Sequence, residues 1–352
     1  MEQIPHKKLR RGWTTGACAT AAARAAACAL LGGDFPDPVR IALPGGETPA
    51  FALALREKGA DFARAGIVKD AGDDPDVTHG ALVIATVRRA GAGQGVSFHA
   101  GEGVGTVTLP GLPLAVGEAA INPAPRLMIR DNLEAVAQAF GQPCDFAVEI
   151  AIPGGEELAA RTMNPRLGIN GGLSILGTSG IVRPYSCAAW IAAIREGLDV
   201  ARALNLPHVA GCTGRMSEMA ARETLGLCEQ ALIDMGDFAG GLLKYIRAHP
   251  LPRLTIAGGL AKMAKLGQGA LDLHSARARV DMARLASDAA CPAIAGAVSV
   301  LQAHDLARGQ GIDLPAIIAR KALETIGETL RHAPVRAGVL VVDRAGKVLA
   351  HV

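Results

Sequence analysis

Residues 208–225 of the chain read HVAGCTGRMSEMAARETL. A short run at His208–Ala210 predicts a strand, the glycines of the following segment predict a loop, and the apolar spacing after it predicts a helix over Ser217–Leu225. The same succession of strand, loop and helix recurs on both sides of this stretch. Such alternation is typical of a mostly parallel sheet covered by helices.

The recurring pattern covers the second part of the chain. It predicts further strands over Leu173–Leu176, Ala231–Asp234, Leu254–Ala257 and Val339–Val342. It predicts helices over Ser186–Leu204, over Phe238–Ala248, from Gly259, near 292–308 and over 314–331, with Asp313 capping the last. We therefore predict an α/β, Rossmann-like domain over residues 151–352.

The first part has a different texture. A helix is predicted over Thr14–Leu31, with Thr14 or Thr15 as its N-cap, and a second helix after Pro125. Short strands separated by glycine-rich turns are predicted at 38–43, 50–56, 62–69, 81–88, 94–99 and 104–109. We predict an α+β domain over residues 1–150. Two domains suit 352 residues, since single cores stop growing near 250–300 residues.

Composition and charge exclude several classes of protein. Aromatic residues make up only 3% of the chain, which argues against a base-stacking platform, and a net charge of +3 is too small for a DNA-binding face. No run of 18 uncharged apolar residues occurs, so we expect no membrane span. We also expect no signal peptide, because Arg24 interrupts the apolar stretch Ala17–Leu31.

Cysteine usage indicates a cytoplasmic protein. The chain has 7 cysteines, an odd number without regular spacing, which predicts free thiols in a reducing compartment. Neither CxxC nor HExxH occurs, so we expect no zinc site. Cys187 and Cys212 have no His or Asp partner at a recognisable spacing, and we interpret them as buried thiols rather than nucleophiles.

Three glycine-bearing loops follow predicted strands. The segment GGLSILGTSGIVRP at 171–184 joins glycines, hydroxyls and a helix start, as a nucleotide-type cofactor loop does, although a plain strand-to-helix turn is the alternative. The others are AGCTGR at 210–215 and AGGLAK at 257–262. In one parallel sheet all three would lie at the same edge. Asp234 ends another strand, where it could accept hydrogen bonds from a ribose or cap the next helix. The predicted cofactor-binding residues are Gly177, Thr178, Ser179, Gly180, Gly211, Thr213, Gly214, Asp234, Gly258 and Gly259.

An acidic cluster is a candidate for proton handling. The segment KDAGDDPDVTHG at 69–80 holds four carboxylates and a histidine, and crowded carboxylates raise one another's pKa. The alternative is an Asp-rich surface turn. The predicted catalytic residues are Asp70, Asp73, Asp74 and His79.

Arginines before helix starts are candidates for binding anions. The segment LRRGWTTGAC at 9–18 places two arginines before a helix rich in glycine and threonine, which would seat a carboxylate. A capped helix with solvated arginines is the alternative. The predicted substrate-binding residues are Arg10, Arg11, Thr14, Thr15, Arg183 and Arg215.

Several motifs in order resemble the CbiD family, which is cobalt-precorrin-5B C(1)-methyltransferase of cobalamin biosynthesis. They are RRGWTTGACATAAARAA, KDAGDDPDVTHGA, GEGVGTVTLPGL with INPAPR after it, MNPRLGINGGLSILGTSGIVRP and AGCTGR. The resemblance covers residues from about 9 to 275 and, more loosely, the C-terminal helices. It implies that S-adenosylmethionine donates a methyl group to C1 of a cobalt-bound tetrapyrrole, giving cobalt-precorrin-6A. The cobalt then belongs to the substrate, and we expect no protein-bound metal.

The implied chemistry needs positioning more than a protein nucleophile. Methyl transfer from a sulfonium is an in-line displacement, and the macrocycle carbon is itself the nucleophile. The acidic cluster could steer the sulfonium or accept a proton. A nicotinamide-dependent precorrin reductase stays open, although GxGxxG is absent, and so does a non-enzymatic tetrapyrrole carrier. Partners are expected to be the tetrapyrrole, without nucleic acid or membrane, and self-association or contact with neighbouring pathway enzymes is left open.

Overall fold

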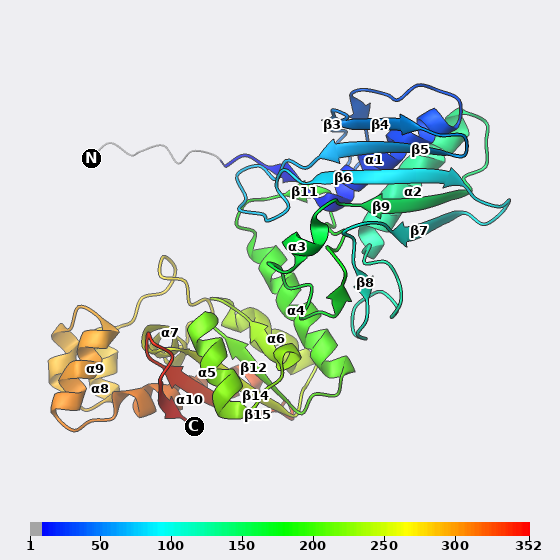
Figure 1. Ribbon diagram of the computed structural model, residues 1–352. Helices are drawn as coiled ribbons and strands as arrows, with labels where there is room; N and C mark the ends of the chain where they lie inside the picture. Colours follow the sequence, from blue (N-terminus) through cyan, green and yellow to red (C-terminus); the bar gives the residue numbers. More distant parts are fainter. Residues whose placement is uncertain (1–8) are drawn as a thin grey trace, which may run out of the picture. The chain divides into compact units, whose positions relative to one another are not determined.

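The chain folds into two compact units that divide between Ser186 and Cys187 (Figure 1). The computed structural model describes residues 9–352, so the first eight residues of the basic N-terminal stretch lie outside the described part. Helices combine with parallel and antiparallel strands, which confirms the predicted α/β class. Within residues 9–352 no helix has the length and apolar character to cross a membrane.

The first unit is built on a five-stranded sheet with two helices on one face. The strands, in order across the sheet, are β4 (Leu55–Lys58), β5 (Phe62–Val68), β6 (Leu82–Arg89), β9 (Phe146–Ala151) and β7 (Val96–Ala100). Neighbours are antiparallel except β7 and β9, which are parallel. The buried face alternates along each strand, as with Val83, Ala85 and Val87 of β6. This face packs against α1 (Thr15–Leu30) and α2 (Pro123–Ala139).

The first helix confirms its predicted position and cap. Thr14 is the N-cap, and its hydroxyl accepts a hydrogen bond from Ala17 N at 3.1 Å. The helix is rich in alanine and nearly all of its residues are buried. Because alanine side chains are small, α1 can approach both the sheet and α2 closely, which suits a core with few aromatic residues.

Short two-stranded ribbons complete the first unit. They are β1 (Gly12–Trp13) with β11 (Ile181–Val182), β2 (Val39–Arg40) with β3 (Ala50–Phe51), and β8 (Thr106–Val107) with β10 (Ile169–Asn170). A short helix, α3 (Gly155–Ala159), follows β9. Two ribbons thus pair segments that are far apart in the chain.

These ribbons place the domain boundary later than predicted. Residue 150 falls inside β9, and the segment 151–186 belongs to the first unit because β10 and β11 pair there. The predicted strand Leu173–Leu176 is not part of the parallel sheet. Leu173 and Ile175 form only isolated bridges within the first unit, where both side chains are buried.

The second unit has a mostly parallel sheet, as predicted. Its strands, in order across the sheet, are β13 (Leu232–Asp234), β12 (His208–Cys212), β14 (Arg253–Gly259), β15 (Arg336–Val342) and β16 (Val348–His351). The first four are parallel, and the unpredicted β16 is antiparallel. Numbered along the chain, this is the doubly wound order 2-1-3-4-5.

Helices cover both faces of this sheet. Alternate strand residues pack either against α5 (Arg215–Leu225) or against the larger cluster formed by the other helices. Those helices are α4 (Cys187–Ala203), α6 (Ala239–Ala248), α7 (Leu260–Gly267), α8 (Met282–Asp288), α9 (Val300–Gly309) and α10 (Leu314–Leu330). Asp313 caps α10 as predicted, since its side chain accepts from Ala316 N at 3.0 Å. The chain leaves β12 and β14 towards opposite sides, so the crevice expected for a ligand lies at their carboxyl ends.

Candidate functional site

The first predicted glycine loop lies in the first unit, against the N-terminal strand. Thr14 N donates to Gly180 O at 3.0 Å, and Gly16 N donates to Leu176 O at 3.1 Å. Gly177 has a φ of +118°, and a Cβ there would lie 2.4 Å from Cγ2 of Thr14. The expectation that this loop shares the edge of the parallel sheet is therefore wrong. Packing requires glycine at 177 and 180, while Thr178 and Ser179 are exposed.

Arg10 and Asp70 form a two-pronged ion pair beside this loop. Nη2 of Arg10 donates to Oδ1 of Asp70 at 2.9 Å, and Nη1 donates to Oδ2. The hydrogen bonds from Arg10 and from Gly72 N lower the pKa of Asp70 to about 2. The sequence analysis predicted raised pKa values from crowding, and for Asp70 that prediction is wrong because an arginine sixty residues away faces the carboxylate.

The other members of the acidic cluster also hold the loop in place. Oδ2 of Asp73 accepts from Arg10 N at 2.7 Å, and Oδ1 of Asp74 accepts from Tyr185 N at 2.8 Å. Nδ1 of His79 accepts from Ala71 N at 3.1 Å. Three segments distant in sequence are thus tied together. The cluster is closer to a structural clamp than to a row of free proton acceptors.

A buried ion pair supports the base of the same loop. The Lys69 side chain is only 1% exposed, and its Nζ donates to Oδ2 of Asp76 at 2.6 Å. Burial alone would raise the pKa of Asp76, but the Lys69 ammonium and the hydrogen bonds from Thr78 lower it. Both charges are therefore matched where water is scarce.

Two predicted arginines stay exposed at the ends of neighbouring strands. In β1 and β11, Gly12 is paired with Val182 in antiparallel register. Arg11 precedes Gly12 and Arg183 follows Val182, so the two arginines flank the same end of this ribbon. Neither has an ion-pair partner among residues 9–352. By contrast, Thr15 is buried, with its hydroxyl accepting from Leu176 N at 3.0 Å.

The other two glycine loops meet at the carboxyl edge of the second sheet, as predicted. Cys212 at the end of β12 aligns with Asp234 of β13 and with Ala257 of β14. Thr213 N donates to Ala257 O at 3.0 Å, which joins the two loops directly. Nζ of Lys262 donates to Thr213 O at 2.9 Å and contacts Oδ1 of Asp237 at 3.1 Å. The edge is therefore a connected and ordered surface.

Packing requires glycine at some positions of this edge and not at others. A Cβ at Gly211 would lie 2.8 Å from Cδ1 of Leu242, and one at Gly258 would lie 2.8 Å from Oγ1 of Thr213, so packing requires both. Gly214 has a φ of +153° and precedes α5, whose first residue is the exposed Arg215. At Gly259 the only atom within 4 Å of a Cβ would be Val342 O at 3.9 Å. Contacts with neighbouring atoms therefore do not require a glycine at 259, although glycine is a favourable N-cap for α7.

Asp234 lies at the end of β13 and does not cap the next helix. Its Oδ1 accepts from Gly236 N at 3.2 Å, while the N-cap of α6 is Phe238. The capping role that the sequence left open is thus excluded. A carboxylate offers about four acceptor positions on its two oxygens.

The two cysteines considered as nucleophiles have different surroundings. Cys212 is fully buried in the core of the second sheet, which confirms its prediction. Cys187 is only partly buried, and Nη2 of Arg277 lies 3.7 Å from its sulfur. Within residues 9–352 no three His, Cys, Asp or Glu side chains come together as metal ligands would.

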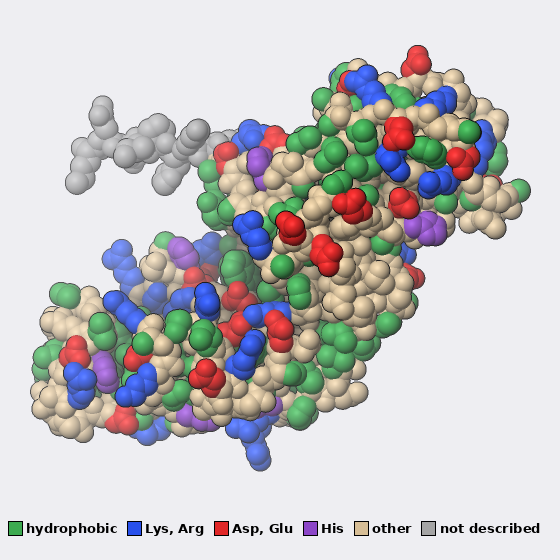
Figure 2. Space-filling model, in the orientation of Figure 1, with side chains coloured by type: hydrophobic (Ala, Val, Ile, Leu, Met, Phe, Trp, Pro, Cys, Tyr) green, Lys and Arg blue, Asp and Glu red, His purple; other side chains and the backbone are tan. Residues whose placement is uncertain are grey.

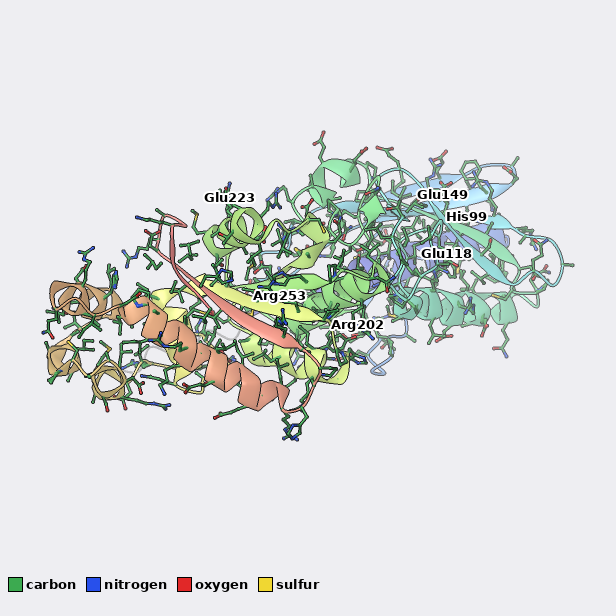
Figure 3. All side chains as sticks on the ribbon, turned by 90° about the horizontal axis from the view of Figure 1, so that it is seen from below. His99, Glu118, Glu149, Arg202, Glu223 and Arg253 are labelled. Atoms are coloured by element: carbon green, nitrogen blue, oxygen red, sulfur yellow. The ribbon has the colours of Figure 1, made fainter. Side chains whose placement is uncertain are left out.

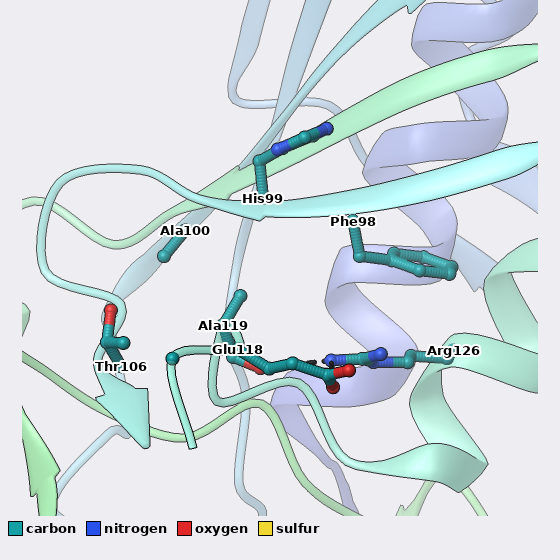
Figure 4. Close-up of a pocket in the computed structure, with 8 residues that line it drawn as sticks. Phe98, His99, Ala100, Thr106, Glu118, Ala119 and Arg126 are labelled. Carbon is teal, nitrogen blue, oxygen red and sulfur yellow. Dashed lines mark hydrogen bonds and ion pairs between the residues drawn. The ribbon is translucent and has the colours of Figure 1, made fainter. Parts of the chain in front are cut away.

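The sequence analysis missed a pocket of about 450 Å³ in the first unit (Figure 4). It is lined by Phe98, His99, Ala100, Thr106, Gly117, Glu118, Ala119 and Arg126. Arg126 contacts Glu118 at 2.8 Å and donates to Ile121 O and Ala119 O at 2.7 and 3.1 Å. The lining comes from β7, β8, α2 and the loop before α2, so no single segment signalled it. The motif INPAPR ends with the lining residue Arg126, and the motif GEGVG directly precedes Thr106 in sequence.

Charges of both signs are mixed on the molecular surface. Figure 2 shows acidic and basic side chains interspersed over each unit on the visible face. Figure 3 shows His99 and Glu149 of the first unit close together, as their parallel register on β7 and β9 requires. Positive and negative side chains are therefore mixed on the visible surface of each unit.

Comparisons with known proteins give a consistent result over the whole chain. The family model described as CbiD matches residues 2–184, and the model described as CbiD, C-terminal domain, matches residues 272–352. A protein of Paramagnetospirillum magneticum named cobalt-precorrin-5B C(1)-methyltransferase is 61% identical over 97% of both chains. Proteins of the same name from Rhodospirillum rubrum and Brucella anthropi are 58% and 56% identical, over 97% and 98% of this chain and 97% and 96% of their own.

One solved structure also matches. It is a cobalamin biosynthesis protein (cbiD) from Archaeoglobus fulgidus, which is 26% identical, with 86% of this chain and 85% of that chain covered and a TM-score of 0.41.

The Arg10–Asp70 pair predicts a pH-dependent contribution to stability. The folded pKa of Asp70, about 2, lies below its ordinary value of 3.8, so the ionised pair stabilises the fold above pH 4 and its contribution fades as the pH falls towards 2. Asp70→Asn is expected to lower the urea midpoint at pH 6–7, with a smaller effect at pH 3. Asp61→Asn, at an exposed loop residue of the same unit, is the control. Equal effects of Asp70→Asn at every pH would contradict the assignment.

Proposed function

Because the chain belongs to the CbiD family, we propose that it is a cobalt-precorrin-5B C(1)-methyltransferase of cobalamin biosynthesis. In this reaction a methyl group passes from S-adenosylmethionine to C1 of a cobalt-bound tetrapyrrole, leaving S-adenosylhomocysteine and cobalt-precorrin-6A. The observation that carries the proposal is 61% identity over 97% of the chain to a relative of that name. The methyl donor and the residues involved are parts of the proposal.

The donor is proposed to bind at the carboxyl edge of the second sheet. This edge lies where the chain leaves β12 and β14 towards opposite sides, which is the place where open α/β sheets bind ligands. Gly259 supports the assignment, because its backbone is open to a ligand and no neighbouring atom requires a glycine there. Lys262 keeps the loops after β12 and β13 in a fixed relation, so the surface is ordered before a ligand arrives.

Asp234 is proposed to accept hydrogen bonds from the ribose hydroxyls. It ends the strand next to β12, level with Cys212, and its carboxylate is at the same edge as both loops. Gly214 and Thr213 are proposed to face the rest of the donor. The proposed donor site does not include Gly177, Thr178, Ser179 and Gly180, because their loop belongs to the first unit, and the donor contacts predicted for them stay untested.

The macrocycle is proposed to bind through its carboxylate side chains. Arg11 and Arg183 flank one end of the β1–β11 ribbon and have no carboxylate partner within residues 9–352. Paired guanidinium groups suit carboxylates because each presents planar donors. Arg10 is a weaker candidate, since Asp70 occupies its guanidinium. A role for Arg215 stays a prediction.

The residues of the acidic cluster fit positioning better than proton transfer. In the reaction the C1–CH₃ bond forms as the S–CH₃ bond breaks, and the electron pair of the broken bond stays on sulfur. Asp70, with a pKa of about 2, stays ionised at neutral pH, and Nδ1 of His79 already accepts a backbone hydrogen bond. Asp73 and Asp74 likewise accept hydrogen bonds from the backbone. A catalytic role for these four residues stays a prediction.

The alternatives have less support. A nicotinamide-dependent reductase would need a GxGxxG loop after the first strand of the sheet, where this chain has AGCTGR. A tetrapyrrole carrier would leave the open backbone at Gly259 without a role. A cytoplasmic location is supported by seven free thiols and stays part of the proposal, as do self-association and contact with neighbouring enzymes.

Calorimetric titration with S-adenosylhomocysteine tests the donor site. The unaltered chain is expected to bind it saturably and not to bind NADH. Gly259→Ala is expected to weaken binding about tenfold or more and to lower the unfolding temperature only slightly, because the added methyl group fills ligand space and alanine is a poorer N-cap for α7 than glycine. Gly296→Ala, at a position equally free of neighbours, is the control. Binding of NADH alone would contradict the proposal. Full affinity of Gly259→Ala for S-adenosylhomocysteine would show that the donor binds elsewhere.

Turnover kinetics test the carboxylate site. Arg11→Gln with Arg183→Gln is expected to raise KM for the macrocycle at least about a hundredfold, since each charged hydrogen bond contributes roughly 1.5–3 kcal/mol and the double variant loses two. Affinity for S-adenosylhomocysteine should stay unchanged. Arg40→Gln, at another exposed position of the first unit, is the control. An unchanged KM in the double variant would exclude these arginines from the site.

A further inference from the structure

Trp190 stands partly exposed beside the proposed donor site. It is one of 2 tryptophans in the chain, lies on α4, and is 46% exposed. Its indole Nε1 donates to Asp234 O at 3.1 Å, so the ring is attached to the last residue of β13.

One side of the indole ring packs against a glycine. Gly236 has a φ of +53°, and a Cβ there would lie 3.2 Å from Cζ2 and 3.3 Å from Cε2 of Trp190. A side chain at 236 would therefore crowd the ring, and the positive φ of this position also favours glycine. Phe238 packs beside it, with ring centroids 6.2 Å apart at 49°. The hydrogen bond and these two contacts fix the plane of the ring and leave part of it open.

The position of the ring relates it to the proposed donor site. Asp234, to which the indole is bonded, aligns with Cys212 of β12, which in turn aligns with Ala257 of β14. Adjacent strands lie about 4.8 Å apart, so the three strand ends span roughly 10 Å, comparable with the length of a nucleoside. Trp190 thus lies at the β13 end of this row, beyond the carboxylate proposed for the ribose.

We propose that the exposed face of the Trp190 indole binds the adenine ring of S-adenosylmethionine by stacking, which rests on the proposed function. Adenine has a flat π-face, and a base stacked on an aromatic side chain gains affinity without specific hydrogen bonds. The hydrogen-bonded indole needs no rearrangement to bind adenine, so little affinity is lost in ordering the site. Gly236 then serves to seat the tryptophan rather than to contact the ligand.

Tryptophan fluorescence tests the assignment, because the second tryptophan lies in the other unit. Trp13→Phe leaves Trp190 as the remaining tryptophan, while Trp190→Phe leaves Trp13, which packs edge-on to Phe51 at 5.4 Å. S-adenosylhomocysteine and adenosine are expected to quench Trp13→Phe saturably, at the affinity that calorimetry gives. Homocysteine, which lacks adenine, should not quench it, and none of the three should affect Trp190→Phe.

The affinity for S-adenosylhomocysteine is the second measurement. Trp190→Leu is expected to bind S-adenosylhomocysteine about ten- to a hundredfold more weakly and Trp190→Phe to lose less, because a smaller ring still stacks. Tyr245→Phe on α6 is the control, and unfolding temperatures check that each variant is folded. Calorimetric binding to Trp13→Phe without any fluorescence change, or full affinity in Trp190→Leu, would overturn the stacking while leaving the methyl donor in place. No binding of S-adenosylhomocysteine to the unaltered chain would instead overturn the proposed function, and this assignment with it.

Discussion

The parallel pairing of β12 with both β13 and β14 is the constraint on which the proposed site depends. This pairing brings Cys212, Asp234 and Ala257 level with one another, so that the loops after the three strands meet at one edge. Hydrogen bonds from Thr213 and Lys262 then join those loops. A methyl transfer needs its donor held in one orientation, and an edge that is connected before binding can do this without losing affinity to reorganisation.

The first unit holds together segments that are distant in sequence. Gly12 allows this, because a Cβ there would lie 2.0 Å from the carbonyl carbon of Ala71. The Arg10–Asp70 pair and the hydrogen bond that Tyr185 N donates to Oδ1 of Asp74 connect the same three segments. The long motifs of this unit therefore act largely on one another, and the exposed Arg11 and Arg183 at their margin are the residues proposed to contact the substrate.

The sequence predicted local structure well and partners poorly. Alternation of strand and helix identified the parallel sheet, and Thr14 and Asp313 were recognisable caps because capping is local. An apolar run as short as Leu173–Leu176 does not reveal which sheet or loop will bury it, so the first glycine loop was assigned to the second domain. The pKa of Asp70 depends on Arg10, which is sixty positions away in the sequence. The proposed role of Trp190 depends on its hydrogen bond to Asp234 O, which the sequence alone does not reveal.

Hydrogen–deuterium exchange with and without S-adenosylhomocysteine would locate the donor on the chain. The account predicts slower exchange of the backbone amides at 213–215, 235–237 and 258–262, which lie at the carboxyl edge of the second sheet. The amides of the first glycine loop, at 176–182, should keep their rates. Protection confined to 176–182, under conditions in which calorimetry shows the ligand bound, would contradict the account and place the donor in the first unit.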